Sequence, residues 1–220
     1  MSGKRSGPRA PKVRELEFGV LTEASVADLD DDETMEALRW RGADFGAAAL
    51  RGATFVGCEL IGVALFEADL TAARFSDSRV TRVNTPVLKA PDASWTGSVL
   101  EGSRIGAWEG YGAHLRATQF IGRKVTYANL RGASLTDAVF TDCTFDELDL
   151  MDCTGARVAY ANCTIGLLTL HRTKIASFDL RGASIGAVSG MDGLRGATMT
   201  EDQIAMLATQ FADHLGIVVD

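Results

Sequence analysis

Thiols and imidazoles are the groups in this chain best suited to bind a metal or act as nucleophiles. The four cysteines are Cys58, Cys143, Cys153 and Cys163, and the last three follow one another at intervals of ten residues. Such regularity could indicate zinc ligands. Zinc sites are usually built from closer pairs such as Cys-x-x-Cys, however, and the sequence contains none. The spacing therefore does not predict a metal site.

The histidines offer no better basis for catalysis. His114, His171 and His214 are far apart in the sequence. A cysteine nucleophile needs a base within hydrogen-bond reach, and no pairing of that kind is indicated. The sequence also lacks a phosphate-binding loop and a dinucleotide-binding fingerprint. We therefore predict that the protein is not an enzyme and uses no metal, cofactor or small-molecule substrate.

Carboxylates form the remaining candidate site, which suits interaction rather than catalysis. Residues 132–156 hold six acidic residues and no Lys or Arg. We call these six the acidic belt: Asp137, Asp142, Asp146, Glu147, Asp149 and Asp152. The formal net charge of the whole chain is −7, which disfavours direct binding to nucleic acid. Residues 36–198 are nevertheless neutral, with 17 acidic and 17 basic residues.

The elements that position these groups are predicted by a repeat of five residues. Of the 30 positions from 40 to 185 whose number is divisible by five, 26 hold a large apolar residue. The exceptions are Thr85, Ala90, Gly110 and Gly155. A second column, two residues earlier, holds mostly small residues such as Ala133 and all four cysteines. Both columns are expected to face a common interior.

Period five fits neither a helix nor a flat strand. A helix repeats every 3.6 residues, and a strand alternates its faces every two. The two columns can share an interior only if the chain makes a short extended segment and then a corner in every unit. Glycine is common two places after the large residue, as at Gly132, and suits such a corner. The pattern therefore predicts a cornered solenoid whose stacked turns pair by their backbones.

Units such as Ala128-Asn129-Leu130-Arg131-Gly132 and Ala68-Asp69-Leu70-Thr71-Ala72 resemble the A(D/N)LXX consensus of the pentapeptide-repeat family. The resemblance covers about residues 36–190. It implies an all-β solenoid, a right-handed quadrilateral β-helix with four pentapeptides per turn. Residues twenty apart should then stack, which places Phe55, Phe75 and Trp95 in one aromatic ladder. Phe120, Phe140 and Tyr160 would form a second ladder.

A four-sided coil also places the candidate residues. Cys153 would face the wall opposite Cys143 and Cys163, so the thiols could not share one zinc ion and are expected to be buried and free. A Cys143–Cys163 disulfide between adjacent turns is the geometric alternative. The acidic belt would encircle one turn instead of forming a stripe along the rod. Residues 83–95 fit the pattern weakly, and they either stay in the coil or leave it as a loop.

The two ends lie outside the repeat. We predict a disordered basic tail at residues 1–14, an N-terminal cap at 15–38, the β-helix at 39–190 and a C-terminal capping or dimerisation helix at 191–220. Residues 200–203 are typical of a capping box and predict the start of the helix, and Gly216 is predicted to be its C-terminal cap. One face of the helix would carry four apolar residues, namely Ile204, Leu207, Phe211 and Leu215.

The expected function is binding to another protein. The sequence has no apolar run near 18 residues and no apolar signal segment, so we expect a cytoplasmic protein without membrane contact. The resemblance to the gyrase-protecting branch of the family implies a dimeric rod that mimics DNA, binds DNA gyrase or another type II topoisomerase and gives quinolone resistance. The neutral rod departs from that branch, so a scaffold for a different protein is the alternative. Direct DNA binding would have to rest on the basic tail.

Overall fold

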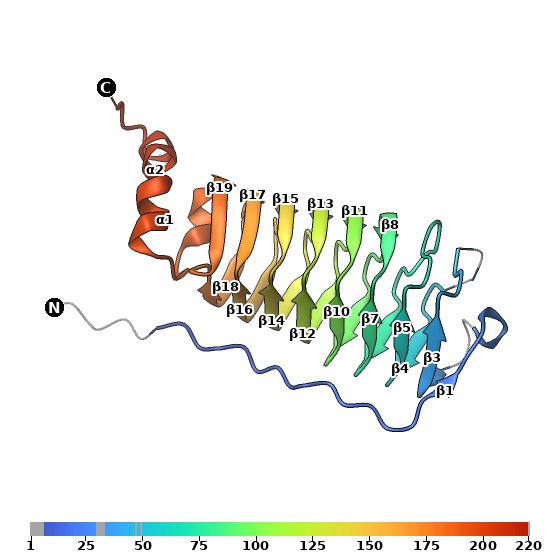
Figure 1. Cartoon of the computed structure of the whole chain (residues 1–220). Helices are drawn as coiled ribbons and strands as arrows, with labels where there is room; N and C mark the ends of the chain where they lie inside the picture. Colours follow the sequence, from blue (N-terminus) through green and yellow to red (C-terminus); the bar gives the residue numbers. More distant parts are fainter. Residues whose placement is uncertain (1–6, 30–33, 47, 49, 220) are drawn as a thin grey trace.

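The structure, a computed structural model, describes residues 7–29, 34–46, 48 and 50–219. The chain forms a parallel β-solenoid of about eight turns with short helices at its C-terminal end (Figure 1). Within the coil, strands pair in parallel with strands of the neighbouring turns. The paired residues are twenty apart, as in Phe55 with Phe75 and Leu135 with Leu115, except at the N-terminal end, where Thr22 pairs with Leu38. Because each unit has five residues, four units make one turn, as expected.

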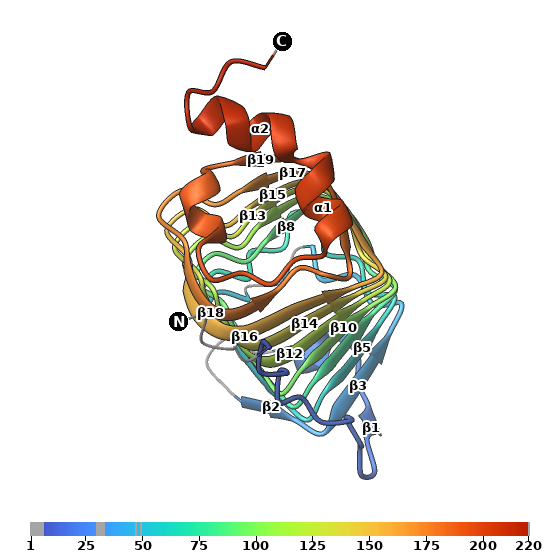
Figure 2. The same ribbon diagram turned by 90° about the vertical axis from the view of Figure 1, so that its left-hand side faces the viewer.

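The strands form two sheets that enclose one interior (Figure 2). The larger sheet contains β1 (Thr22–Glu23), β2 (Thr34–Glu36), β3 (Leu38–Arg41), β4 (Thr54–Val56), β5 (Glu59–Ile61), β6 (Arg74–Ser76), β7 (Arg79–Thr81), β9 (Ser94–Thr96), β10 (Val99–Glu101), β12 (His114–Ile121), β14 (Ser134–Thr141), β16 (Thr154–Ala161) and β18 (Lys174–Asp179). The smaller sheet contains β8 (Asn84–Lys89), β11 (Arg104–Glu109), β13 (Lys124–Asn129), β15 (Thr144–Asp149), β17 (Cys163–Thr169) and β19 (Ala183–Ser189).

The solenoid interior is filled by the column of positions divisible by five. Each of these residues from Trp40 to Ile185 is buried, apart from the partly exposed Gly155. The corners adopt positive φ angles, for example 68° at Gly132 and 53° at Asp142. Glycine tolerates this region freely, and Asp and Asn tolerate it better than most other residues. The five-residue period therefore produces both the core and the turns.

Both aromatic ladders are confirmed. The rings of Phe55 and Phe75 stack with centroids 4.7 Å apart, and Trp95 follows at 4.0 Å. In the second ladder, Phe140 lies 4.8 Å from Phe120 and from Tyr160. Residues 83–95 stay in the coil, because β8 and β9 pair with strands of neighbouring turns. The alternative, in which this segment leaves the coil as a loop, is wrong.

The N-terminal end differs from the expected tail and cap. Residues 7–18 run extended along the rod, and the first six residues lie outside the described part (Figure 1). The backbone N–H of Lys12 donates to Asp137, the carbonyl of Arg14 accepts from Gln119, and that of Leu16 accepts from Arg79. These contacts hold the segment, which we call the strap, against the solenoid.

The solenoid also begins earlier than residue 39. Strand β2 already pairs with β4 in the twenty-residue register, and Met35 lies buried below Phe55. What remains of the cap is β1, which pairs with β3, and the 3-10 helix η1 (Val26–Asp28). The indole N–H of Trp40 donates to the carbonyl of Ser25 at 2.8 Å, which ties this cap to the first turn. The acidic run from Asp28 to Glu33 lies largely outside the described residues.

The C-terminal end has two short helices where the sequence predicted one. A 3-10 helix, η2 (Met191–Leu194), precedes α1 (Glu201–Met206), and α2 (Ala208–His214) follows a break at Leu207. The capping box of Thr200 and Gln203 is present, and Gly216 has a positive φ of 71° after α2. Because the helix breaks, the four apolar residues do not share one buried face.

Candidate interaction surfaces

Three of the six carboxylates of the acidic belt are paired with arginines. Arg157 binds both carboxylate oxygens of Asp137, at 2.5 and 2.7 Å. Arg172 binds Asp152 in the same two-pronged manner, at 2.5 and 2.6 Å. Both arginines lie one turn further along the rod. Each guanidinium lowers the pKa of its carboxyl partner, because it favours the charged form.

Two further carboxylates of the belt also have partners. Asp149 is buried, and its Oδ2 lies 2.6 Å from the Nε of Arg131. Its other oxygen accepts from the backbone N–H of Met151 at 2.9 Å. Asp142 accepts from the side-chain amide of Asn162 at 2.5 Å. The ion pair of Asp149 offers little free charge to a partner, whereas Asp142 is exposed and keeps its negative charge, because an amide donor is neutral.

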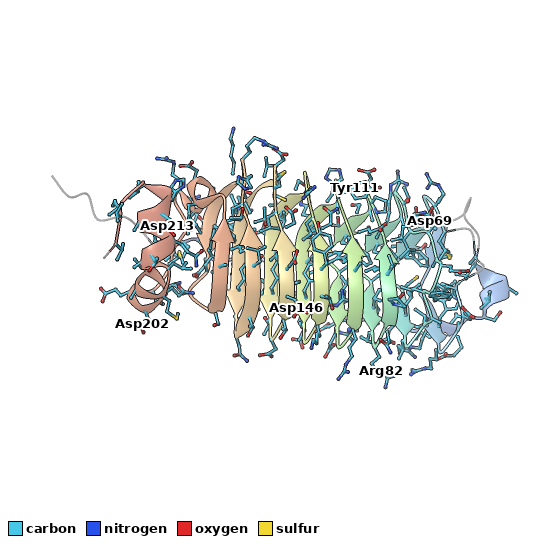
Figure 3. The ribbon with its side chains drawn as sticks, turned by 90° about the horizontal axis from the view of Figure 1, so that it is seen from above. Asp69, Arg82, Tyr111, Asp146, Asp202 and Asp213 are labelled. Atoms are coloured by element: carbon cyan, nitrogen blue, oxygen red, sulfur yellow. The ribbon has the colours of Figure 1, made fainter. Side chains whose placement is uncertain are left out.

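Asp146 and Glu147 are the two belt residues that are exposed on β15. Within the described part of the chain, neither takes part in an ion pair. Figure 3 shows Asp146 at the middle of the outer face of the smaller sheet. Among the described residues, Asp146 and Glu147 are therefore the two carboxylates of the acidic belt without a side-chain partner.

The smaller sheet presents these two carboxylates on a surface of mixed charge. Lys89, Arg104 and Lys124 lie exposed on the preceding strands β8, β11 and β13. On the same strands Val87 is 41% exposed and Tyr127 is partly exposed. The outer face of the smaller sheet is therefore basic towards the N-terminal end and acidic at β15. We call it the charged face.

The thiols lie inside the solenoid, where they cannot meet a substrate. All four cysteines are buried and free, as expected, and no disulfide joins them. Each Sγ donates to a backbone carbonyl of an earlier turn, and the shortest contact is from Cys153 to Leu130 at 2.9 Å. Burial raises the pKa of Cys153 to about 12, so this thiol is not a ready nucleophile. No cluster of three metal-binding side chains occurs in the described residues.

The histidines bond to hydroxyls on the surface. His114 lies 3.1 Å from the Oγ of Ser134, and His171 lies 2.9 Å from that of Ser189. Residues 182–186 form a Gly-x-Ser-x-Gly sequence, which in many hydrolases marks a nucleophile elbow between a strand and a helix. Here Ser184 lies within β19, and its hydroxyl has no hydrogen bond to a histidine in the described structure. This geometry does not support catalysis.

At the C-terminal end, the four candidate residues separate into two pairs. Leu207 is buried against the last turn and Phe211 packs beside it. Ile204 is 45% exposed and Leu215 is 70% exposed. All four except Leu207 line an open, mainly apolar groove of about 500 Å³ between η2 and the two helices. The first pair caps the solenoid, and the second faces the solvent.

Two buried polar residues, Gln203 and Arg123, were not predicted from the sequence. Gln203 is buried, and its amide donates to the carbonyls of Leu180 and Ala183 in the last turn, at 2.7 and 2.5 Å. Arg123 occupies the inward column of small residues and is 2% exposed. The signal for Arg123 was present, because a charged residue breaks that column. Gln203 gave no comparable signal beyond its place in the capping box.

The repeat in the structure agrees with a known sequence family. The sequence profile of pentapeptide repeats matches eight copies, in residues 41–84 and 124–154. The chain belongs to the pentapeptide-repeat family. No curated protein matches it in sequence.

Two solved structures of the family resemble the chain. One is QnrB1, a plasmid-mediated fluoroquinolone resistance protein, at 15% identity and a TM-score of 0.40, with 84% of this chain and 100% of that chain covered. The other is HetL, a pentapeptide repeat protein involved in heterocyst differentiation regulation from the cyanobacterium Nostoc sp. It has 20% identity and a TM-score of 0.30, with 74% of this chain and 79% of that one covered.

Proposed function

We propose that this protein is a non-enzymatic interaction rod that binds a protein partner through its charged face. The observation that supports this most is the contrast between the interior and the charged face. The thiols are buried, and four of the six belt carboxylates are held by neighbouring side chains. On the charged face, Asp146 and Glu147 remain exposed beside basic strands. A stiff surface with fixed charges favours a partner with the opposite pattern.

DNA gyrase, or another type II topoisomerase, is the first named target to test. A rigid rod can hold carboxylates at positions that match the phosphate groups of DNA, which a DNA-binding enzyme contacts. The assay is gyrase supercoiling with purified protein, together with quinolone tolerance of cells that express it. We expect inhibition that weakens when Asp146→Lys and Glu147→Lys are combined. The matched control is Glu101→Lys, which changes an exposed acid of β10 in the larger sheet, away from the charged face. Absence of both inhibition and tolerance would remove gyrase as the target.

A scaffold that binds a different protein is the second candidate. It is favoured by the arginine partners of Asp137, Asp149 and Asp152, because these pairs remove charge that a DNA mimic would display. Capture of a defined partner that excess DNA does not displace would support this role. The same capture should fail with the Asp146→Lys, Glu147→Lys double variant. A partner displaced by DNA would instead support mimicry.

We also propose that the protein forms a homodimer through its C-terminal helices. Ile204 and Leu215 are exposed beside the open apolar groove, and Ile217 to Val219 are exposed as well. Apolar side chains grouped in this way are typical of interfaces. Light scattering should give twice the chain mass for the wild type and the single mass for Leu215→Asp. A single mass for the wild type would rule out this dimer.

A further inference from the structure

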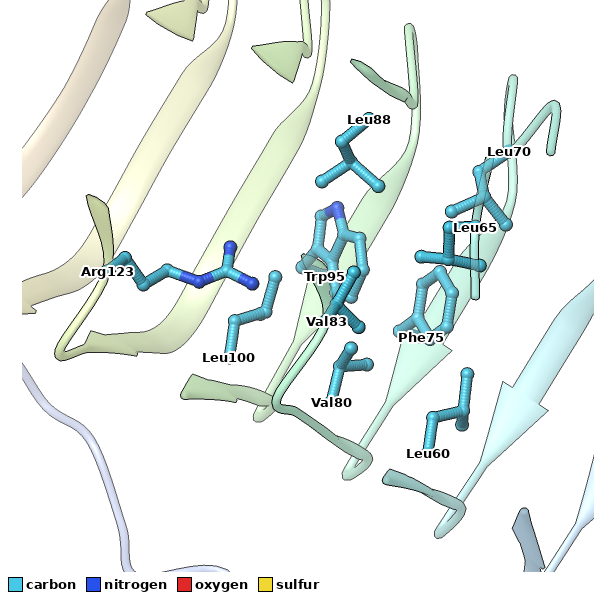
Figure 4. Close-up of a pocket in the computed structure, with 10 residues that line it drawn as sticks. All are labelled: Leu60, Leu65, Leu70, Phe75, Val80, Val83, Leu88, Trp95, Leu100 and Arg123. Carbon is cyan, nitrogen blue, oxygen red and sulfur yellow. The ribbon is translucent and has the colours of Figure 1, made fainter. Parts of the chain in front are cut away.

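The cavity inside the coil is too small to receive a ligand. It lies among apolar side chains such as Leu100 and Phe75, beside the buried Arg123 (Figure 4), and its volume is about 10 Å³. That volume is at the lower limit for a single water molecule. A site for a partner therefore has to be sought on the outer surface, where the strap crosses the larger sheet.

The solenoid holds the strap mainly by its backbone. The carboxylate of Asp137 accepts from the backbone N–H of Lys12 at 2.8 Å. The side-chain amide of Gln119 donates to the carbonyl of Arg14 at 2.9 Å. The guanidinium of Arg79 donates to the carbonyl two residues further along the strap, at 3.1 Å. Every extended segment carries such backbone groups, so these contacts do not require the strap's own sequence.

Two side chains of the strap add specific contacts. Arg14 forms an ion pair with Asp77 at 2.5 Å, and Leu16 is 8% exposed. Val99 of β10 lies between the two residues that bind the strap carbonyls, because it pairs in register with both. Val99 is itself only 5% exposed, although it lies outside the core cluster. The strap therefore crosses over Val99, and the site favours a cation followed two residues later by an apolar side chain.

The strap is also separable from the solenoid. Residues 7–18, all of them described, form no strand and pair with none. Leu16 lies outside the cluster of buried side chains that forms the core. The link to the coil runs through Gly19 and Val20, and Val20 is 95% exposed. The stacked turns can therefore keep their pairing and their core when the strap leaves the surface.

We propose that the surface beneath the strap is a peptide-binding site for an extended segment of a partner protein, and that the strap fills it in the free chain. We call it the strap site, which consists of Asp77, Arg79, Val99, Gln119 and Asp137. The partner segment carries a cation and, two residues later, an apolar side chain, as the strap does at Arg14 and Leu16. The strap site lies on the larger sheet, so it is separate from the charged face. A partner has to displace the strap, which lowers its apparent affinity.

Binding of a strap peptide from solution tests this inference. The probe is a fluorescent peptide with the sequence of residues 7–18, and its polarisation is measured with the full chain carrying Leu16→Asp, which frees its own strap. We expect saturable binding to this variant. Binding to the wild type should be at least about tenfold weaker, because the strap already fills the site. Equal binding to the two proteins, or no binding to the variant, would overturn the proposal.

A charge exchange tests where the peptide binds. Asp77→Arg, added to the Leu16→Asp chain, should weaken binding of the unchanged peptide, and a peptide with Arg14→Glu should restore it. Arginine suits this corner, because Arg157 has a φ of 57° and Asp77 has one of 49°. The matched control is Asp92→Arg, at an exposed corner of another wall, which should leave the binding of both peptides unchanged. Peptide affinities that ignore Asp77→Arg would place the peptide elsewhere and refute the strap site.

A further measurement uses the unaltered chain. In isotope-labelled wild-type protein, excess unlabelled peptide should move the amide signal of Lys12 towards that of a free segment, because Asp137 then releases it. A signal that stays in place at about a hundredfold of the concentration that half-saturates the Leu16→Asp variant would contradict the exchange. A second copy of the chain also carries a strap. A dimer of the Leu215→Asp chain that Leu16→Asp dissolves would assign the site to that copy and overturn the assignment to a partner protein.

Discussion

The aromatic ladder of Phe120, Phe140 and Tyr160 allows a quantitative test of how the turns hold together. Phe140 is fully buried, and its ring stacks on both neighbours at 4.8 Å with interplanar angles of 10° and 8°. The perturbation is Phe140→Leu, which keeps an apolar side chain in the core and removes both stacked contacts. Phe66→Leu is the matched control, because the Phe66 side chain lies on the outer surface of the coil and is 58% exposed.

The expected loss follows from these two contacts and from the edge-on contact of Phe140 with Phe145 at 6.0 Å. An aromatic pair contributes about 0.5–1.5 kcal/mol beyond its buried area, so three pairs give roughly 1.5–4.5 kcal/mol. Truncation to alanine also leaves a cavity, and Phe140→Ala should cost about 3–5 kcal/mol. Phe66→Leu should change the free energy of unfolding by less than about 0.5 kcal/mol.

Guanidinium chloride unfolding gives the free energies, and amide hydrogen exchange shows whether the loss is local to the neighbouring turns. Exchange matters here because a solenoid can lose its turns one by one, which breaks two-state behaviour. In a double-mutant cycle, Phe140→Leu should couple to Tyr160→Leu by about 0.5–1.5 kcal/mol. It should not couple to Phe75→Leu in the other ladder. A cost for Phe140→Leu no larger than that of Phe66→Leu would refute the ladder argument.

Three further predictions concern the surface and the two ends. Because Arg157 lowers the folded pKa of Asp137, this carboxylate stabilises the fold above its unfolded pKa of about 4. The stability difference between Asp137→Asn and the wild type should be full at pH 7 and shrink as the pH falls below about 4; a constant difference in pH-dependent unfolding would contradict this. Gln203→Leu should cost about 1–3 kcal/mol, because it removes two buried hydrogen bonds and leaves the Leu180 carbonyl with only the backbone N–H of Ala183 as its donor. Exchange of amides in β19 should quicken, while Glu201→Leu on the exposed side of the same helix should not have this effect. Leu16→Asp should release the strap, so trypsin should cut after Arg14 faster with an unchanged melting temperature; equal cleavage rates would show that the strap is not held by its buried leucine.

The repeat was sufficient to predict most of the fold. A period of five residues with two inward columns specifies a cornered coil. The resemblance to the pentapeptide-repeat family implied the four sides, from which stacking at intervals of twenty follows. The same rule explains the ladders and the partners of the belt. Asp137 and Arg157 are twenty residues apart, so their side chains project from the same corner of successive turns. The fold could thus be predicted because each local unit repeats the same constraint.

Features outside the repeat could not be predicted in this way. The strap is held by contacts of Lys12, Arg14 and Leu16 with residues far away in the sequence. The five-residue period does not include these residues and so could not predict their contacts. The break at Leu207 depends on how the helix meets the last turn, where Gln203 must reach two carbonyls. Tertiary contacts decide such details, because a helix of this length has little stability of its own.

The twenty-residue register restricts how this protein can change its length. Removing or adding a single unit of five residues would rotate every later residue by one wall around the axis. Asp146 and Glu147 would then leave the wall that carries Lys124 and Arg104, although each turn could still pack. Removal of a whole turn would shorten the rod and keep every wall aligned. Where a partner contacts more than one turn of the surface, the rod should therefore vary in length by whole turns of four pentapeptide units.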